Sequence, residues 1–452
     1  MAAFPDHFRW GAATAAFQIE GSTGADGRTD SIWDVFCRKP GAVLGGDTGD
    51  PACDHYNRMP QDVDLLASLG LDTYRFSVAW PRVRPDAAAP NAKGIDFYSR
   101  LVDTLLDKGI RPWVTLYHWD LPQTLEDAGG WTNRDTAYRF AEYALTVHEA
   151  LGDRVDTWTT LNEPWCSAFL GYASGDHAPG RTQPRAAVAA VHHLLLAHGL
   201  GLKALREAGV TDAGITVNLQ PFEPSRPERR DDVDLVRRLD GLQNRLFLDP
   251  LLRGRYPTDV ARDLEPFGLA DHVRDGDLKL IGAPIDVLGV NYYTSAQVAA
   301  EEPDGDADRL AWAVGAPVAR VVRRDLPTTA MGWEITPDAF RDLLIRLKDE
   351  YPPVPIVITE NGSAWDDEVS GGSVDDTERV EYLRSHLGAV HEAVEAGVDV
   401  RGYLAWSLLD NFEWAFGYSK RFGIVYVDYS TQQRIPKRSA KVLADIARRN
   451  TL

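Results

Sequence analysis

The chain has 452 residues and a mass of 50.0 kDa, with 44% hydrophobic and 25% charged residues, which is an ordinary globular composition. This composition excludes a disordered chain, because there is enough apolar surface to offset the loss of chain entropy on folding. Lys and Arg number 48 against 67 Asp and Glu, so the net charge of −19 opposes a nucleic-acid partner, and we expect none.

Short apolar runs alternate with amphipathic helical patterns from one end of the chain to the other. Eight of these runs show little polar alternation, as expected of strands that are buried on both faces of a parallel sheet. In chain order they are residues 9–13, 73–78, 112–117, 157–161, 214–219, 287–292, 356–359 and 402–407. Between them, Phe97, Leu101 and Leu105 mark one face of a predicted helix, and a second long helical pattern covers residues 379–396.

This alternation predicts an α/β protein that forms a (β/α)8 TIM barrel with enlarged loops after its strands. The long loops are residues 25–49, 223–230, 300–327 and 365–376, since apolar strands resume after each. A doubly wound open sheet has the same periodicity and stays an alternative, but the sequence lacks the glycine-rich nucleotide-binding turns that favour it. A barrel with insertions can exceed about 400 residues, so we expect residues 1–452 to form a single domain.

The cysteines and the apolar segments bear on the cellular setting. Cys37, Cys53 and Cys166 form neither a disulfide framework nor a metal-binding motif, and their small odd number fits a reducing compartment. The N-terminus lacks the apolar core of a signal peptide, and no apolar run of membrane-spanning length follows. We therefore expect a cytoplasmic protein without a membrane partner, and its oligomeric state stays open.

Two carboxylates end predicted strands, at the edge where a barrel carries its active site. Glu163 ends the fourth strand and Glu360 ends the seventh. One such glutamate is more often a solvated loop residue, but two at matching ends of the barrel indicate a site. Paired carboxyl groups are what cleavage of a glycosidic bond requires, since one protonates the leaving oxygen while the other attacks the anomeric carbon or activates water.

Glu163 lies in the segment Thr160-Leu161-Asn162-Glu163-Pro164, and Glu360 lies in the segment Ile358-Thr359-Glu360-Asn361-Gly362. These segments closely resemble the acid/base and nucleophile motifs of family 1 glycoside hydrolases, the β-glucosidase family. Further similar motifs occur in the family's order at residues 8–21, 75–77, 117–120, 291–294 and 406–414. The resemblance extends over nearly the whole chain. It implies one catalytic (β/α)8 domain, no cofactor and no metal.

The resemblance also implies an activity and a role for each matching residue. The implied activity is retaining hydrolysis of terminal non-reducing β-D-glucosyl residues, with β-galactosides and β-fucosides as further substrates. Glu163 is implied as the general acid/base and Glu360 as the nucleophile that forms a covalent glycosyl intermediate. Arg75 and Tyr293 are implied as its supports, the guanidinium keeping Glu360 ionised and the hydroxyl orienting one oxygen. Taken alone, Arg75 also suits a structural salt bridge.

Two larger sets of residues are implied to bind the substrate. Around the glycone they are Gln18, His118, Trp119, Asn162, Asn291, Trp406, Glu413, Trp414 and Phe422. On the aglycone side they are Trp165, Phe169, Leu170, Tyr172 and Trp333, for which core packing is an equally fair interpretation. The expected substrates are small β-glycosides and cellobiose-type oligosaccharides, which connects the chain with cellulose degradation.

Three other functions stay open on the sequence. A carbohydrate-binding barrel without catalysis is opposed by the presence of both glutamates. A metal-dependent hydrolase would need ligands, but the adjacent pair His192 and His193 lies in a helical run where neighbouring side chains face apart. Transglycosylation would use the same covalent intermediate. Within the family, Glu413 favours an unphosphorylated glycone, because a carboxylate repels a phosphate dianion.

Overall fold

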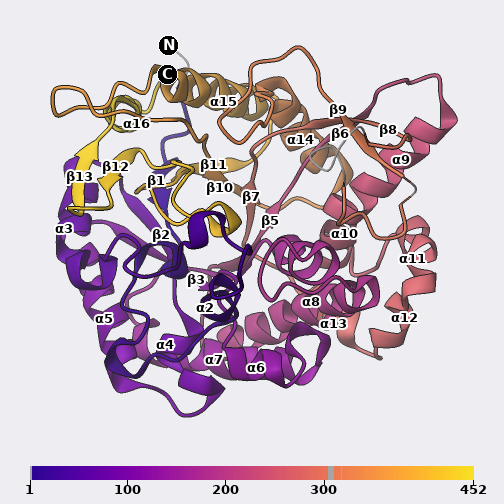
Figure 1. The fold of residues 1–452 in the computed structure, drawn as a ribbon, viewed down its shortest axis with the longest axis horizontal. Helices are drawn as coiled ribbons and strands as arrows, with labels where there is room; N and C mark the ends of the chain where they lie inside the picture. The colour runs from indigo at the N-terminus through magenta and orange to yellow at the C-terminus, as the bar shows by residue number, and fades with distance from the viewer. Residues whose placement is uncertain (1–2, 304–309, 317) are drawn as a thin grey trace.

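Eight parallel strands close into a barrel in the computed structural model, which describes residues 3–303, 310–316 and 318–452 (Figure 1). The barrel strands are β1 (Arg9–Ala13), β2 (Thr73–Ser77), β3 (Arg111–Tyr117), β4 (Thr157–Asn162), β5 (Ala213–Asn218), β7 (Val287–Asn291), β10 (Ile356–Asn361) and β11 (Val400–Trp406). Their order is β1-β11-β10-β7-β5-β4-β3-β2, and β2 pairs with β1 to close the ring. The predicted (β/α)8 fold is confirmed.

The apolar runs locate these strands to within about two residues. The largest difference at a carboxyl end concerns β10, which continues through Glu360 and Asn361. Both residues are polar, so an apolar pattern ends before them, although their backbone still pairs with the neighbouring strands. Glu360 therefore lies within a strand rather than in a loop.

Helices cover the outside of the barrel. The longer ones are α3 (His55–Ser68), α5 (Ala92–Asp107), α7 (Asp135–Leu151), α8 (Pro184–Glu207), α9 (Arg230–Asp240), α14 (Pro337–Glu350), α15 (Thr377–Glu395) and α16 (Arg438–Arg449). The shorter ones are α1 (Ala16–Ile19), α2 (Ile32–Cys37), α4 (Trp80–Val83), α6 (Gln123–Asp127), α10 (Leu246–Arg253), α11 (Thr258–Asp263), α12 (Leu269–His272) and α13 (Asp277–Ile281). In α5, Phe97, Leu101 and Leu105 are buried as predicted, because they share the face that packs on the barrel.

The long loops carry two small sheets of their own. β6 (Phe222–Pro224), β8 (Ala296–Ala299) and β9 (Arg320–Val322) form one, and β12 (Val425–Asp428) and β13 (Gln433–Pro436) form the other. The predicted loop at 223–230 thus contains part of β6. Within the predicted loop at 300–327, residues 304–309 and 317 lie outside the described residues. These sheets follow barrel strands β5, β7 and β11, so they build up the edge where those strands end.

Helix α8 corrects one expectation drawn from the sequence. By length and composition it is apolar enough to cross a membrane, so a run of that kind is present. However, 89% of its apolar window is buried inside the protein. Leu194, Leu195, Leu196 and other apolar residues are buried around the helix, which is therefore a core helix packed between α7 and the barrel.

The interior of the barrel is closely filled beneath the strand ends. At Gly289 in β7, a Cβ atom would lie 2.2 Å from Oγ1 of Thr216 and 2.8 Å from Oγ1 of Thr359, so only glycine fits. Thr359 in turn donates a hydrogen bond from Oγ1 to Oδ1 of Asn291 at 2.7 Å. The packed layer thus orients an amide that points into the space above it.

A buried ion network holds the segment that follows β11. Nζ of Lys437 donates to Oδ2 of Asp367 at 2.6 Å and to Oδ1 of Asp410 at 2.7 Å, and all three side chains are at most 2% exposed. Asp410 also accepts hydrogen bonds from Arg421 at 2.7 Å and from the Gly423 backbone at 2.9 Å. These bonds fix both ends of the loop that carries Glu413.

We expect Lys437→Met to lower the free energy of unfolding by about 3–5 kcal/mol, because it leaves two buried carboxylates without their shared cation. The measurement is chemical denaturation at constant m value. The control is Lys441→Met at an exposed position in the first turn of α16, the helix that begins directly after Lys437, and it should change stability by less than about 0.5 kcal/mol. Equal stabilities of the two variants would contradict the importance of this network.

Candidate active site

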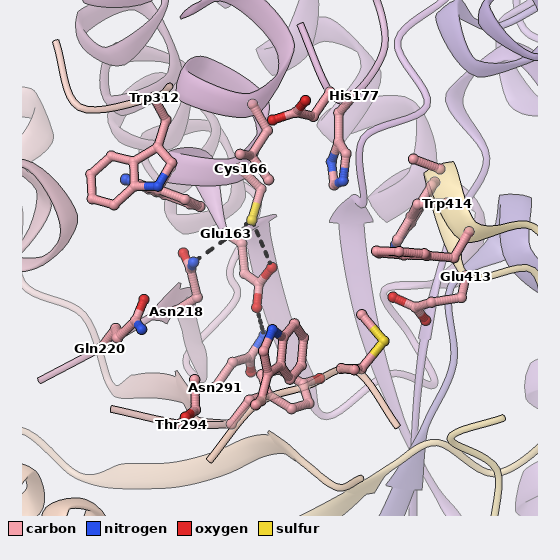
Figure 2. A pocket seen from close by; sticks show the side chains of 18 of the residues that line it. Glu163, Cys166, His177, Asn218, Gln220, Asn291, Thr294, Trp312, Glu413 and Trp414 are labelled. Atoms are coloured by element: carbon pink, nitrogen blue, oxygen red, sulfur yellow. Dashed lines mark hydrogen bonds between the residues drawn. The ribbon is translucent and has the colours of Figure 1, made fainter. Parts of the chain in front are cut away.

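A cavity of about 1120 Å³ opens at the carboxyl ends of the barrel strands (Figure 2). Its wall includes Glu163, Asn291, Glu360 and Trp406, which lie at or directly after the ends of β4, β7, β10 and β11. Parallel strands bring their carboxyl ends to one face of a barrel, so residues far apart in the sequence meet there.

Glu163 occupies a sharp turn directly after β4 and is only 5% exposed. Its backbone has φ of 47°, in the left-handed region that residues with a side chain rarely adopt. The turn is held because the Glu163 backbone N–H donates to the carbonyl of Thr216 at 2.9 Å. Strained backbone of this kind is typical of functional positions.

Glu360 is 3% exposed, and both of its carboxylate oxygens accept hydrogen bonds. Nη1 of Arg75 donates to Oε1 at 2.7 Å, and the Tyr293 hydroxyl donates to Oε2 at 2.8 Å. Arg75 lies in β2 and is itself 1% exposed, so its charge is not screened by solvent. The structure thus places the two predicted partners on Glu360 and anchors it in one orientation.

Asn162 and Asn291 connect the two glutamates. Nη2 of Arg75 donates to Oδ1 of Asn162 at 2.7 Å, and Nδ2 of Asn291 donates to the same oxygen at 3.1 Å. Nδ2 of Asn291 also donates to Oε1 of Glu163 at 2.7 Å. Every side chain in this network is buried. The positions of Glu163 and Glu360 are therefore coupled through hydrogen bonds as well as through charge.

Burial raises the pKa of Glu163 to about 8, and the negative charge of Glu360 adds to the rise. Burial also raises the pKa of Glu360, but the charge and hydrogen bond of Arg75 and the Tyr293 hydroxyl oppose this rise. Glu360 ionises first, because it is the member of the pair that accepts a charge-assisted hydrogen bond. When the pair holds one proton, that proton is therefore on Glu163.

This division of charge suits acid-assisted displacement. A protonated carboxyl group can deliver its proton to a leaving oxygen, and an ionised one can attack a carbon atom or activate water. The same two groups in solution would both be ionised at neutral pH. Burial beside one arginine is what separates their roles.

The predicted glycone residues gather on one side of the cavity. His118, Trp119, Trp406, Glu413, Trp414 and Phe422 line it, whereas Gln18 and Asn162 are fully buried and are not part of the described wall. The His118 ring stacks on Trp406 with ring centroids 5.6 Å apart and an interplanar angle of 19°. Trp119 lies against Trp414 at 4.5 Å, and its Nε1 donates to the carbonyl of Asn162 at 2.9 Å.

Three polar atoms of this set suit a ligand rich in hydroxyl groups. Within the described part of the chain, Oε1 of Gln18, Nδ1 of His118 and Oε2 of Glu413 are buried and have no hydrogen-bond partner. Buried polar atoms normally find a partner. Burial lowers the pKa of His118 well below its usual value, with the Arg75 charge adding to the effect, so the ring is neutral and its Nδ1 can accept or donate a hydrogen bond, depending on the tautomer.

Three of the five residues predicted for the aglycone side lie in the cavity wall, and their role there stays a prediction. Trp165, Leu170 and Trp333 line the cavity, with Trp333 packed against Tyr293 at 5.4 Å. Phe169 and Tyr172 do not line it, and their assignment is wrong. Both are fully buried behind the wall.

The reason lies in the local backbone, because a π-helical segment (Cys166–Ser174) follows Glu163 and its turns direct these two side chains inward. Phe169 packs against Trp165 at 6.1 Å. The Tyr172 hydroxyl donates to Oε2 of Glu126 at 2.6 Å.

Several wall residues escaped the sequence analysis. Cys166 contacts Glu163 directly, with 3.2 Å between Sγ and Oε2. Asn218 and Gln220, at and after the end of β5, line the side next to it, as does Trp312 from the long loop. The position of Asn218 at a strand end was a usable signal, whereas nothing local distinguishes Trp312 from a core tryptophan.

The histidine pair named for a metal has other partners. His192 hydrogen-bonds with the Tyr256 hydroxyl and with Asp277, both at 2.9 Å, and His193 hydrogen-bonds with the carbonyl of Trp131 at 2.9 Å. Over residues 3–303, 310–316 and 318–452, no group of three or more His, Cys, Asp or Glu side chains is arranged to hold a metal ion. The expectation that no metal or cofactor is needed stays a prediction.

Comparison with known proteins identifies the family. The family model described as Glycosyl hydrolase family 1 matches residues 1–452. The chain belongs to glycosyl hydrolase family 1. The resemblance inferred from the motifs is confirmed, and membership makes the protein an enzyme that hydrolyses glycosidic bonds.

Named members of family 1 are similar to this chain over its whole length. "Thermostable beta-glucosidase B" of Thermobispora bispora is 55% identical, over 99% of this chain and 91% of its own. "Bifunctional beta-D-glucosidase/beta-D-fucosidase" of Bifidobacterium breve is 51% identical, over 96% of each.

Solved family 1 structures agree closely in fold. The psychrophilic β-glucosidase BglU from Micrococcus antarcticus has a TM-score of 0.97 at 52% identity, covering 100% of this chain and 98% of that one. The β-glucosidase from Thermotoga maritima in complex with glucoimidazole has a TM-score of 0.93 at 47% identity, covering 100% of both.

The coupled glutamates of this family 1 site lead to a test that does not depend on turnover. We expect Glu360→Gln to lower the pKa of Glu163 below about 8, because the substitution removes the neighbouring negative charge while burial stays. The measurement is a 13C NMR titration of protein with labelled glutamate, with Glu163→Gln identifying the resonance. An unchanged pKa would show that burial alone sets it.

Proposed function

We propose that this chain is a retaining β-glucosidase whose residues 1–452 form one catalytic domain. Its substrates in this proposal are β-glycosides with a terminal non-reducing glucosyl residue, including aryl and alkyl glucosides and cellobiose-type oligosaccharides, with β-galactosides and β-fucosides as further substrates. The observation that carries the proposal is the buried pair Glu163 and Glu360, linked by Arg75, Asn162 and Asn291 beside an aromatic pocket. The β-glucosidase and β-fucosidase activities named for its relatives support it.

In the first step, an oxygen of Glu360 attacks the anomeric carbon of the glycoside. The bond from that carbon to the leaving oxygen breaks, and the leaving oxygen takes the proton of Glu163 and departs as an alcohol. Arg75 and Tyr293 hold the attacking carboxylate in place, so that little freedom remains to be lost on the way to the transition state. The product is an ester between the sugar and Glu360.

In the second step, Glu360 is esterified and no longer carries the negative charge that raised the pKa of Glu163. The ionised form of Glu163 is therefore favoured, and Glu163 acts as a base. It takes a proton from a water molecule whose oxygen attacks the anomeric carbon. The ester bond breaks, which returns Glu360 to its ionised form and releases the sugar with its original configuration. A sugar in place of water would give transglycosylation, so both outcomes share the intermediate.

The aromatic and amide side chains would select the glycone. Trp406 offers a flat apolar surface to the sugar ring, and Gln18, His118 and Glu413 offer donors and acceptors to its hydroxyl groups. Asn162, whose Nδ2 lies 3.1 Å from Nε2 of His118, would add a contact next to Glu163. A role in cellulose degradation would follow from cleavage of cellobiose. The cytoplasm stays the proposed location, supported by three cysteines that are all unpaired.

The double displacement is tested with Glu360→Gly. We expect this variant to lose nearly all turnover of an aryl β-glucoside, because no nucleophile remains to form the ester. Added azide should restore part of it and give an α-glucosyl azide, since azide then attacks from the side that Glu360 occupied. The azide product is identified by NMR.

Glu163→Ala is the matched comparison for Glu360→Gly. It should slow substrates with poor leaving groups far more than a dinitrophenyl glucoside, because a good leaving group needs little proton donation. Wild-type-like activity in either variant would refute the assignment.

A substrate panel tests the glycone. We expect kcat/KM for p-nitrophenyl β-glucoside to exceed that for its 6-phosphate by at least about 100-fold, because the phosphate dianion would meet the Glu413 carboxyl group. Glu413→Gln, which keeps the shape but cannot ionise, should narrow the ratio at about pH 8 and above, because burial raises the pKa of Glu413 to about 8 and the group is charged only there. A preference of the unaltered enzyme for the phosphorylated substrate would overturn the glycone assignment.

A further inference from the structure

Cys166 lines the cavity and hydrogen-bonds to Glu163, and the two catalytic steps proposed above give it no role. It starts the π-helical segment three residues after Glu163, and its backbone N–H donates to the Glu163 carbonyl at 3.0 Å. This short return places Sγ 3.2 Å from Oε2 of Glu163, and the thiol is only 6% exposed (Figure 2). The contact therefore lies on the carboxyl group itself.

The other oxygen of Glu163 is already committed as an acceptor. Thr359 donates to Oδ1 of Asn291, which fixes the orientation of the amide and directs its Nδ2 toward Glu163. Nδ2 then donates to Oε1 of Glu163 at 2.7 Å. Because Oε1 accepts this strong hydrogen bond, protonation of Oε1 is disfavoured. The proton of Glu163 is therefore on Oε2, the oxygen beside Cys166.

The thiol is oriented from its far side by Asn218. Nδ2 of Asn218 lies 3.7 Å from Sγ of Cys166 and donates to it (Figure 2). Burial, together with the charge of Glu163, raises the pKa of the Cys166 thiol well above its usual value, so the sulfur keeps its hydrogen. A protonated thiol that accepts from Asn218 directs its S–H toward Oε2.

We propose that Cys166 is a positioning residue for the acid/base, its thiol holding Oε2 of Glu163 by a hydrogen bond weak enough for that oxygen to carry the catalytic proton. The inference rests on the proposed role of Glu163. A thiol is a weak donor and a weak acceptor, so it restrains the carboxyl group while favouring its ionised form only slightly. A hydroxyl at this place would bind the carboxylate more strongly and would oppose protonation.

The proposal predicts opposite effects of two substitutions on the basic limb of the pH profile. Glu163 donates its proton in the first step, so kcat/KM has its full value below the pKa of Glu163 and falls as the pH rises above that pKa. Cys166→Ser supplies a stronger donor, favours the carboxylate and should move this limb to lower pH by about 0.5–1 unit. Cys166→Val fills the space without a donor and should move the limb to higher pH.

The experiment measures kcat/KM against pH with phenyl β-glucoside, whose leaving group needs a proton, and with a dinitrophenyl glucoside, whose leaving group does not. Both Cys166 variants should show their shifts with the phenyl substrate only. The control is Cys37→Ser at the end of α2, where an equally buried thiol lies outside the described cavity wall, and it should leave the profile in place. Shifts of the two Cys166 variants in one direction, or no shift in either, overturn the proposal.

A substitution at Asn218 provides a second test of the proposal. Asn218→Ala should move the basic limb to higher pH in the native background, and by a smaller amount than Cys166→Val. In the Cys166→Val background the same change should have no further effect, because its influence passes through the thiol. Equal shifts in both backgrounds would show that Asn218 does not act through the Cys166 thiol, and would overturn the proposal that Asn218 orients that thiol.

A measurement on the native sequence covers the case in which a Cys166 variant does not fold. The S–H infrared band of Cys166 should shift as Glu163 titrates, and it should stay constant in Glu163→Gln. A constant band in the native enzyme overturns the proposal.

Failure of this inference is distinguishable from failure of the proposed function. If Glu163→Ala shows no dependence on the leaving group, the acid/base assignment fails. If that dependence is present but the Cys166 variants do not shift the profile, only the inference about the thiol fails.

Discussion

The ion pair between Arg75 and Glu360 is the interaction on which the rest of the site depends. Two carboxyl groups buried in one cavity cannot both ionise cheaply, and the position of the Arg75 guanidinium group decides which of them does. Nη1 of Arg75 lies 2.7 Å from Oε1 of Glu360, while the carboxyl group of Glu163 accepts hydrogen bonds from the neutral side chains of Asn291 and Cys166. The assignment of acid and nucleophile thus follows from where one guanidinium group is held.

Holding that guanidinium group requires the whole barrel. Arg75 comes from β2, Asn162 from the end of β4, Asn291 from β7 and Glu360 from β10, and each is buried and hydrogen-bonded to another of the set. No two of these strands are neighbours except β7 and β10. The network therefore exists only once the ring of strands has closed, which makes the geometry of the site a property of the complete fold.

The same reasoning explains how much could be predicted from the sequence. Strands buried on both faces leave continuous apolar runs, so all eight barrel strands were visible, and Glu163 and Glu360 stood out as charges at their ends. Phe169 and Tyr172 were misassigned because their direction depends on a π-helical segment that has no reliable sequence signal. Cys166 was counted among the cysteines and given no role, since only the turn at Glu163 brings its sulfur back to the carboxyl group. Local patterns report burial, but they do not report which way a side chain turns within it.

The burial that creates the chemistry also acts against the stability of the fold. Burial raises the pKa of Glu163 to about 8, and that of Glu413 to about 8 as well, with the charges of the other glutamates adding to both. In the unfolded chain these groups titrate near their ordinary value, so between about pH 4.5 and pH 8 the folded state binds more protons than the unfolded one.

The contribution of Glu163 and Glu413 to the free energy of unfolding therefore has its full value below about pH 4.5, and it is lost as the pH rises from there to about pH 8. The ion network of Lys437, Asp367 and Asp410 lies just outside the cavity and fixes the loop that carries Glu413. A site that needs a protonated carboxyl group at neutral pH thus depends on a surrounding fold rigid enough to keep that group away from water.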